Sequence, residues 1–83
     1  MFNTHYTQPS SEERRAVLEE SCGVEKIIRE KERAQITGIS RTRWWELEKS
    51  GAVPERISLG TRSVGWRLSD LLYWITRLTN TLA

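Results

Sequence analysis

The chain has 83 residues, which is enough for one domain with a small hydrophobic core. It contains one histidine and one cysteine, which excludes an internal disulfide and a His/Cys metal cluster, and no set of nucleophile, base and acid indicates an enzyme or a cofactor. No apolar run approaches the ~18 residues of a membrane span, and with a lone Cys22 the chain is expected to be cytoplasmic, with no membrane partner.

The N-terminal segment is acidic and the rest of the chain is basic. Residues 1–22 carry two arginines and four glutamates, whereas residues 23–83 carry eleven bases and seven acids. We therefore divide the chain into an N-terminal lead-in with an acidic helix over 1–23 and a domain over 24–83. Residues 1–9 are polar and are expected to be loose.

A first helix is predicted over about 11–22. Ser10 and Glu13 have the spacing of a capping box, and Gly23 stands where a helix commonly ends. The apolar stripe of this helix is thin. It either packs weakly on the domain or offers a surface to a partner.

Two helices joined by a short turn are predicted next. After an extended segment over 24–28, residues 30–37 have a helical composition and are followed by Gly38, which takes a positive φ at no steric cost. Ser40 is a suitable N-cap for a second helix over 41–50. This spacing is typical of a helix-turn-helix.

The second of these helices contains two adjacent tryptophans, which cannot both enter one core because neighbouring helical residues point about 100° apart. On a helical wheel Trp44 shares one face with Leu47, which predicts that both are buried. Trp45 falls on the opposite side, in line with Arg41 and Lys49. This stripe is either a solvated face with a cation lying on Trp45 or a nucleic-acid contact surface.

Two arginines at the start of this helix favour the second interpretation. With Ser40 as N-cap, Arg41 and Arg43 lie in the first turn, where each positive charge opposes the helix dipole at a cost of roughly 0.3 to 1 kcal/mol. The free amides of a helix start bind anions. A DNA phosphate would therefore satisfy the amides and both arginines together.

After this helix the pattern changes to alternation. Ile57 and Leu59 form one alternating pair, and Val64 and Trp66 form another, with a glycine-bearing turn between them. This pattern predicts a β-hairpin with one apolar face.

A last helix is predicted with Ser69 and Asp70 as its cap. Its apolar residues recur at helical spacing, and they are Leu71, Trp74, Ile75, Leu78 and Leu82. Trp44, Trp66 and Trp74 are expected in the core. The predicted fold is mainly α with a small β-hairpin, arranged as a winged helix-turn-helix with an extra N-terminal helix.

The hairpin also carries basic residues. Arg56 and Arg67 are expected on its polar face, where a charge can equally serve solubility. Arg62 lies in the turn beside Ser63, and this position is better suited to meet a phosphate.

These residues resemble a known family. The marks are Thr37-Gly38-Ile39-Ser40, Gly51-Ala52-Val53-Pro54, Leu59-Gly60, Arg62, Val64-Gly65-Trp66-Arg67 and Trp74. Over about 27–80 the sequence is similar to AlpA-type phage and prophage transcriptional regulators, which are small MerR-like winged helix-turn-helix proteins related to excisionases. The resemblance implies a recognition helix over about 41–50 in the DNA major groove and a wing over about 56–67 on flanking DNA.

The family's contacts can be placed on this sequence by position, and wheel and hairpin positions add two further bases. The candidate DNA-binding residues are Arg41, Thr42, Arg43, Trp45, Lys49, Arg56, Arg62, Ser63 and Arg67. The chain departs from the family at three positions. The family usually has an aliphatic residue at the position of Trp44, a Tyr at the position of Trp45 and a basic residue at the position of Glu46. Glu46 either orients Arg43 or Lys49, or accepts a hydrogen bond from a cytosine amino group.

We therefore expect a sequence-specific DNA-binding transcriptional regulator of the phage or prophage type, acting on double-stranded DNA. One alternative is an excisionase, that is, a recombination directionality factor. A second is a protein-interaction module, in which the acidic N-terminal helix or the Trp45 face docks a protein such as RNA polymerase, an integrase or a repressor. Because a single winged helix covers little DNA, homo-oligomers or cooperative tandem binding on DNA are expected.

Overall fold

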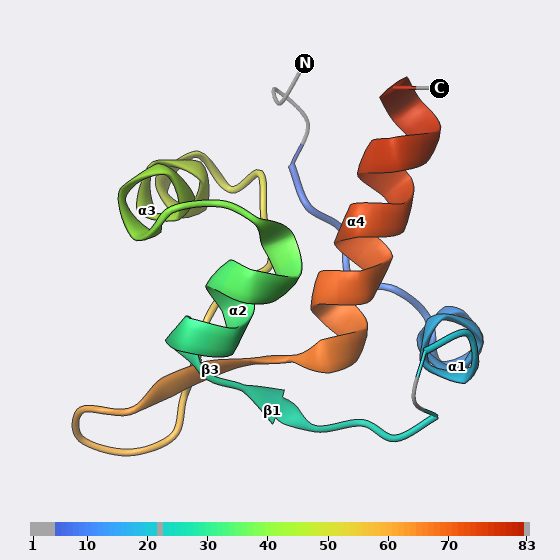
Figure 1. The fold of residues 1–83 in the computed structure, drawn as a ribbon, viewed down its shortest axis with the longest axis horizontal. Helices are drawn as coiled ribbons and strands as arrows, with labels where there is room; N and C mark the ends of the chain where they lie inside the picture. Colours follow the sequence, from blue (N-terminus) through green and yellow to red (C-terminus); the bar gives the residue numbers. More distant parts are fainter. Residues whose placement is uncertain (1–4, 22, 83) are drawn as a thin grey trace.

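The computed structural model describes the backbone of residues 5–21 and 23–82 and the side chains through residue 78, so Cys22 and the Leu82 side chain lie outside the described part. Its elements in chain order are α1 (Ser11–Glu19), β1 (Ile27–Ile28), α2 (Glu30–Thr37), α3 (Arg41–Ser50), β2 (Ile57–Ser58), β3 (Val64–Arg67) and α4 (Leu68–Leu82). The predicted winged helix-turn-helix is confirmed (Figure 1). Among the described helices, none combines the length and apolar character that a membrane crossing requires.

The helix-turn-helix is formed by α2 and α3. Gly38 ends α2 in the left-handed conformation, with φ of 71°. The Ser40 side chain accepts a hydrogen bond from the Arg43 amide at 3.2 Å and caps α3. Both helix boundaries therefore lie where the local capping signals place them.

The sheet has three antiparallel strands in the order β1-β3-β2. The prediction of a hairpin with one apolar face is wrong. Trp66 lies opposite Ile28 and both are buried, whereas Ile57 lies opposite Gly65 and so belongs to the other face. A Cβ at Gly65 would meet Ile27 Cγ2 at 2.5 Å, so this glycine lets outer-face side chains lie close over β3.

α4 begins at Leu68, directly after β3, and this corrects its predicted cap. Ser69 and Asp70 are buried within the first turn instead of preceding it. The carboxylate of Glu25 accepts hydrogen bonds from the Ser69 amide at 3.0 Å and from the Ser69 hydroxyl at 2.6 Å. A residue 44 positions earlier in the chain therefore satisfies the start of α4.

α1 packs against α4 (Figure 1). The predicted capping box of Ser10 is confirmed, and the helix ends at Glu19, before its predicted end. Val17 is buried, and Arg14 pairs with Asp70 on α4 at 3.0 Å. The domain boundary after residue 23 stays a prediction.

The expectation of a loose lead-in is wrong for residues 5–9. The Tyr6 amide donates to the Gly51 carbonyl oxygen at 2.8 Å, and the Tyr6 hydroxyl donates to Asp70 Oδ1 at 2.7 Å. Pro9 is buried. The segment is ordered because it supplies donors to the ends of two helices.

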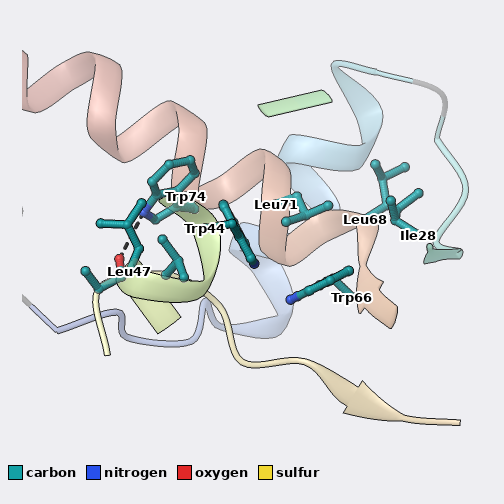
Figure 2. Close-up of a cluster of buried hydrophobic side chains, with 9 residues drawn as sticks. Ile28, Trp44, Leu47, Trp66, Leu68, Leu71 and Trp74 are labelled. Atoms are coloured by element: carbon teal, nitrogen blue, oxygen red, sulfur yellow. Dashed lines mark hydrogen bonds between the residues drawn. The ribbon is translucent and has the colours of Figure 1, made fainter. Parts of the chain in front are cut away.

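The core is built on three tryptophans, as predicted (Figure 2). Trp44 packs edge to face with Trp66, with ring centroids 6.1 Å apart, and with Trp74, at 5.5 Å. This edge-to-face geometry is the one that aromatic quadrupoles favour. Trp74 also donates from Nε1 to the Ala52 carbonyl oxygen at 3.1 Å, which ties α4 to the end of α3.

A fully buried arginine on α2 was not foreseen. The guanidinium of Arg33 lies over Trp44, 4.7 Å from the ring centroid, and pairs with Glu30. Arg33 Nη1 donates to the Ile39 carbonyl oxygen at 2.6 Å and to the Thr37 hydroxyl at 3.2 Å. Arg33 thus joins the core to the turn between α2 and α3.

Candidate nucleic-acid interface

The two adjacent tryptophans of α3 divide the helix as its wheel predicts. Trp44 is 2% exposed and Trp45 is 52% exposed. Lys49 Nζ lies 4.2 Å from the centroid of the Trp45 ring, one turn further along the same face. Because Trp44 holds one face of α3 in the core, the opposite face is presented to solvent as an aromatic and cationic stripe.

The start of α3 is an exposed and basic helix N-terminus. Its first turn contains no acidic residue, and Arg41 and Arg43 are both exposed. Arg43 Nη1 donates to Glu46 Oε1 at 3.2 Å, whereas Lys49 lies on Trp45 instead. Of the two interpretations of Glu46, the free protein shows the one in which it orients Arg43.

α3 and the hairpin enclose a hollow that gathers four of the predicted residues. Its lining includes Arg41, Thr42 and Trp45 from α3 and Arg56 from the start of the hairpin. Arg56 Nη2 lies 2.6 Å from Glu48 Oε1, and this hydrogen bond raises the pKa of the Arg56 guanidinium. Arg56 is therefore held beside α3 as a cation.

The remaining predicted residues lie on the hairpin in two separate places. Arg62 and Ser63 lie in the turn between β2 and β3, which Figure 1 shows on the same side of the molecule as α3 and away from α1. Arg67 lies opposite Ile27 on the outer sheet face and lines a different hollow beside Asp70. Arg62 and Ser63 thus share a side of the molecule with α3 but do not line its hollow, and Arg67 lines a hollow that does not include Arg41.

Three charged side chains next to this surface were not singled out from the sequence. Arg29 Nε donates to the Val64 carbonyl oxygen at 3.1 Å beside the hairpin, and Glu30 and Glu48 line the hollow.

The burial of Arg33 had one signal in the sequence, because α2 has only Ala34 and Ile36 as apolar residues. A helix so poor in apolar residues must bury a polar residue wherever it packs.

The geometry agrees with comparisons to known proteins. Residues 26–79 match the family model described as prophage CP4-57 regulatory protein (AlpA). The chain is also similar to a protein of Enterobacteria phage P4, described as uncharacterized protein ORF88, with 33% identity over 51 residues. This match covers 61% of our chain and 58% of the phage P4 protein. No solved structure matches the chain significantly. With its winged helix-turn-helix and a family match over more than half of its length, the chain belongs to the AlpA family of prophage regulatory proteins.

Proposed function

We propose that this protein is a sequence-specific DNA-binding transcriptional regulator of the phage or prophage type. In this proposal α3 enters the major groove, where Thr42, Arg43 and Trp45 contact bases, and Arg41 positions the helix on a phosphate. The hairpin turn, with Arg62 and Ser63, contacts the flanking backbone. Membership of a prophage regulatory family supports the class of function.

The observation that carries this proposal is the contrast between the two faces of α3. One face is fixed in the core by Trp44, and the other exposes Arg41, Arg43 and Trp45. Two arginines at a helix N-terminus are unfavourable in isolation by roughly 0.3 to 1 kcal/mol each. Binding of a phosphate by Arg41 and the free amides of the first turn offsets this penalty.

Arg41→Ala combined with Arg43→Ala is expected to weaken specific DNA binding at least ~10-fold and to reduce the salt-dependence slope by about 1, since Arg41 is the phosphate contact of the two. The reason is the loss of two charge-assisted contacts. The measurement is fluorescence anisotropy with promoter or attachment DNA of the protein's own genetic element, titrated at several salt concentrations. Arg15→Ala combined with Arg77→Ala is the matched control, because it removes the same charge from α1 and α4.

Two results would refute the DNA-binding proposal. One is a parent protein without any sequence preference, and the other is an equal loss in the control and the α3 variant. A transcript change in the absence of integrase supports a regulator. Cooperative binding to adjacent sites with DNA bending and a change in the direction of recombination supports the excisionase alternative instead.

Arg62→Ala is expected to weaken binding to all DNA sequences about equally and to lower the salt slope by about 1. Arg62 is exposed in the hairpin turn, so its loss removes a phosphate contact without altering the core. Thr61→Ala, at the neighbouring exposed position, should leave both quantities unchanged. A sequence-dependent effect of Arg62→Ala would contradict a backbone contact.

A further inference from the structure

The C-terminal end of α3 is held by two hydrogen bonds from other parts of the chain. Trp74 Nε1, on α4, donates to the Ala52 carbonyl oxygen at 3.1 Å, and the Tyr6 amide donates to the Gly51 carbonyl oxygen at 2.8 Å. Trp74 lies within the family match over 26–79, whereas Tyr6 precedes it. One of the two bonds therefore comes from a segment that the family pattern does not include.

Tyr6 also contacts α4 through its side chain. Its hydroxyl donates to Asp70 Oδ1 at 2.7 Å, and the same oxygen accepts from Arg14 Nη1 at 3.0 Å. Burial, reinforced by the Asp70 carboxylate, raises the pKa of the Tyr6 phenol, so the hydroxyl remains a donor at all ordinary pH values. A single residue thus joins the end of α3 to the start of α4.

The residues on both sides of Tyr6 are also placed by contacts. His5 lies over Gly51, where a Cβ would meet the His5 ring nitrogen Nδ1 at 2.6 Å. Pro9 is buried, and Ser10 then starts α1 with its capping box. Figure 1 shows this segment passing α4 on its way to α1. We call residues 5–9 the strap.

We infer that the strap positions the recognition helix for DNA and that Tyr6 is its positioning residue, an inference that rests on the proposed DNA-binding function. Figure 1 shows α3 at the edge of the molecule, on the side away from α1. It contacts α4 through Trp44 and Trp74, whose ring centroids lie 5.5 Å apart.

The buried residues within α3 are Trp44 and Leu47, and Ala52 and Val53 directly after the helix are buried as well. The bonds at Gly51 and Ala52 act where the end of the helix joins this buried segment. Base readout tolerates displacements of only about 0.5 Å.

Three full-length variants test this inference. Tyr6→Ala removes the bridge to Asp70, Tyr6→Phe removes only the hydroxyl, and Thr7→Ala changes an exposed neighbour in the same strap. Each is titrated against a duplex that contains the site bound by the parent protein and against a scrambled duplex of equal length. The temperature is chosen so that circular dichroism shows every variant to be folded.

Tyr6→Ala is expected to lose roughly 10-fold in affinity for the site and less than about two-fold for the scrambled duplex, because backbone contacts tolerate a tilted helix and base contacts do not. Tyr6→Phe is expected to lose roughly 3- to 5-fold at the site, in line with one hydrogen bond. Thr7→Ala is expected to match the parent protein on both duplexes.

The ratio of the two affinities separates positioning from folding. An equal loss on both duplexes would mean that Tyr6 contributes only to the folded fraction, and it would overturn the inference. Parent-like affinity of Tyr6→Ala for the site would overturn it as well. A parent protein that does not distinguish the duplexes would refute the proposed function itself, and this outcome is seen before any variant is made.

Discussion

Arg33→Ala is expected to lower the free energy of unfolding by about 3 to 5 kcal/mol, measured by urea denaturation at 25 °C. The substitution removes a buried guanidinium from above Trp44 and leaves the Ile39 carbonyl oxygen without its donor. It also leaves Glu30 without its ionic partner. The turn of the helix-turn-helix is expected to lose its order together with this part of the core.

Two control variants give the Arg33 result its meaning. Arg15→Ala removes an equal charge from an exposed position on α1 and should change stability by less than about 0.5 kcal/mol. Arg33→Met restores apolar volume without any donor and is expected to be intermediate. A methionine variant as stable as the parent protein would show that packing alone matters and would contradict the role of the donated hydrogen bonds.

The adjacent tryptophans of α3 are expected to respond in opposite ways to alanine. Trp44→Ala should lower the free energy of unfolding by about 3 to 5 kcal/mol, because it removes the ring that packs against Trp66 and Trp74. Trp45→Ala should cost less than about 1 kcal/mol, the worth of an exposed cation–π contact with Lys49. Denaturant titration of both variants provides the comparison.

The affinity for DNA is expected to depend on Trp45, although the stability of the fold depends on it only slightly. Trp45→Ala is expected to weaken specific binding by roughly 5- to 100-fold, the equivalent of about 1 to 3 kcal/mol for a lost base contact. Trp45→Phe is the matched variant, since it keeps an aromatic face at the same position. If Trp45→Ala binds DNA as tightly as the parent protein does, the Trp45 ring serves only its cation–π contact with Lys49, and the proposed base contact is wrong.

The acidic residues on the candidate interface are compatible with DNA binding. Glu46 pairs with Arg43, and Glu48 pairs with Arg56. The Arg43–Glu46 pair is exposed, and exposed pairs are worth about 0 to 1 kcal/mol, so a phosphate can replace Glu46 at small cost. The Glu48 side chain is only 11% exposed, so this argument does not extend to its pair with Arg56. Each pair gives its arginine a partner in the free protein, and the two carboxylates lower the net positive charge of this surface.

Predictions from neighbouring residues in the sequence were mostly right. Ser10 with Glu13, Gly38 and Ser40 mark helix ends through hydrogen bonds or backbone angles that involve only the next few residues. Trp44 was assigned to the core through helical periodicity, which is equally local. The assignment of the DNA contacts to particular residues stays a prediction.

Predictions that needed a distant partner failed or were not made. The prediction that the hairpin has one apolar face was wrong because Ile57 lies opposite Gly65 and not opposite Trp66. Alternation within each strand does not specify which residues of the two strands lie opposite each other. The cap of α4 was wrong because Glu25 supplies it from before β1. The polar composition of residues 1–9 predicts a loose segment, yet Tyr6 finds acceptors 45 and 64 residues away, at Gly51 and Asp70.

Local sequence signals were enough to identify the four helices, to place the starts of α1, α2 and α3, and to put Trp44 and Trp45 on opposite sides of α3. These outcomes follow from short-range sterics, capping hydrogen bonds and periodicity. The burial of Arg33 over the Trp44 and Trp66 rings and the bond from Tyr6 to the end of α3 arise from packing between distant parts of the chain. Burying a charge or ordering a polar segment is favourable only when its partners are already in place, and the fold alone brings those partners together.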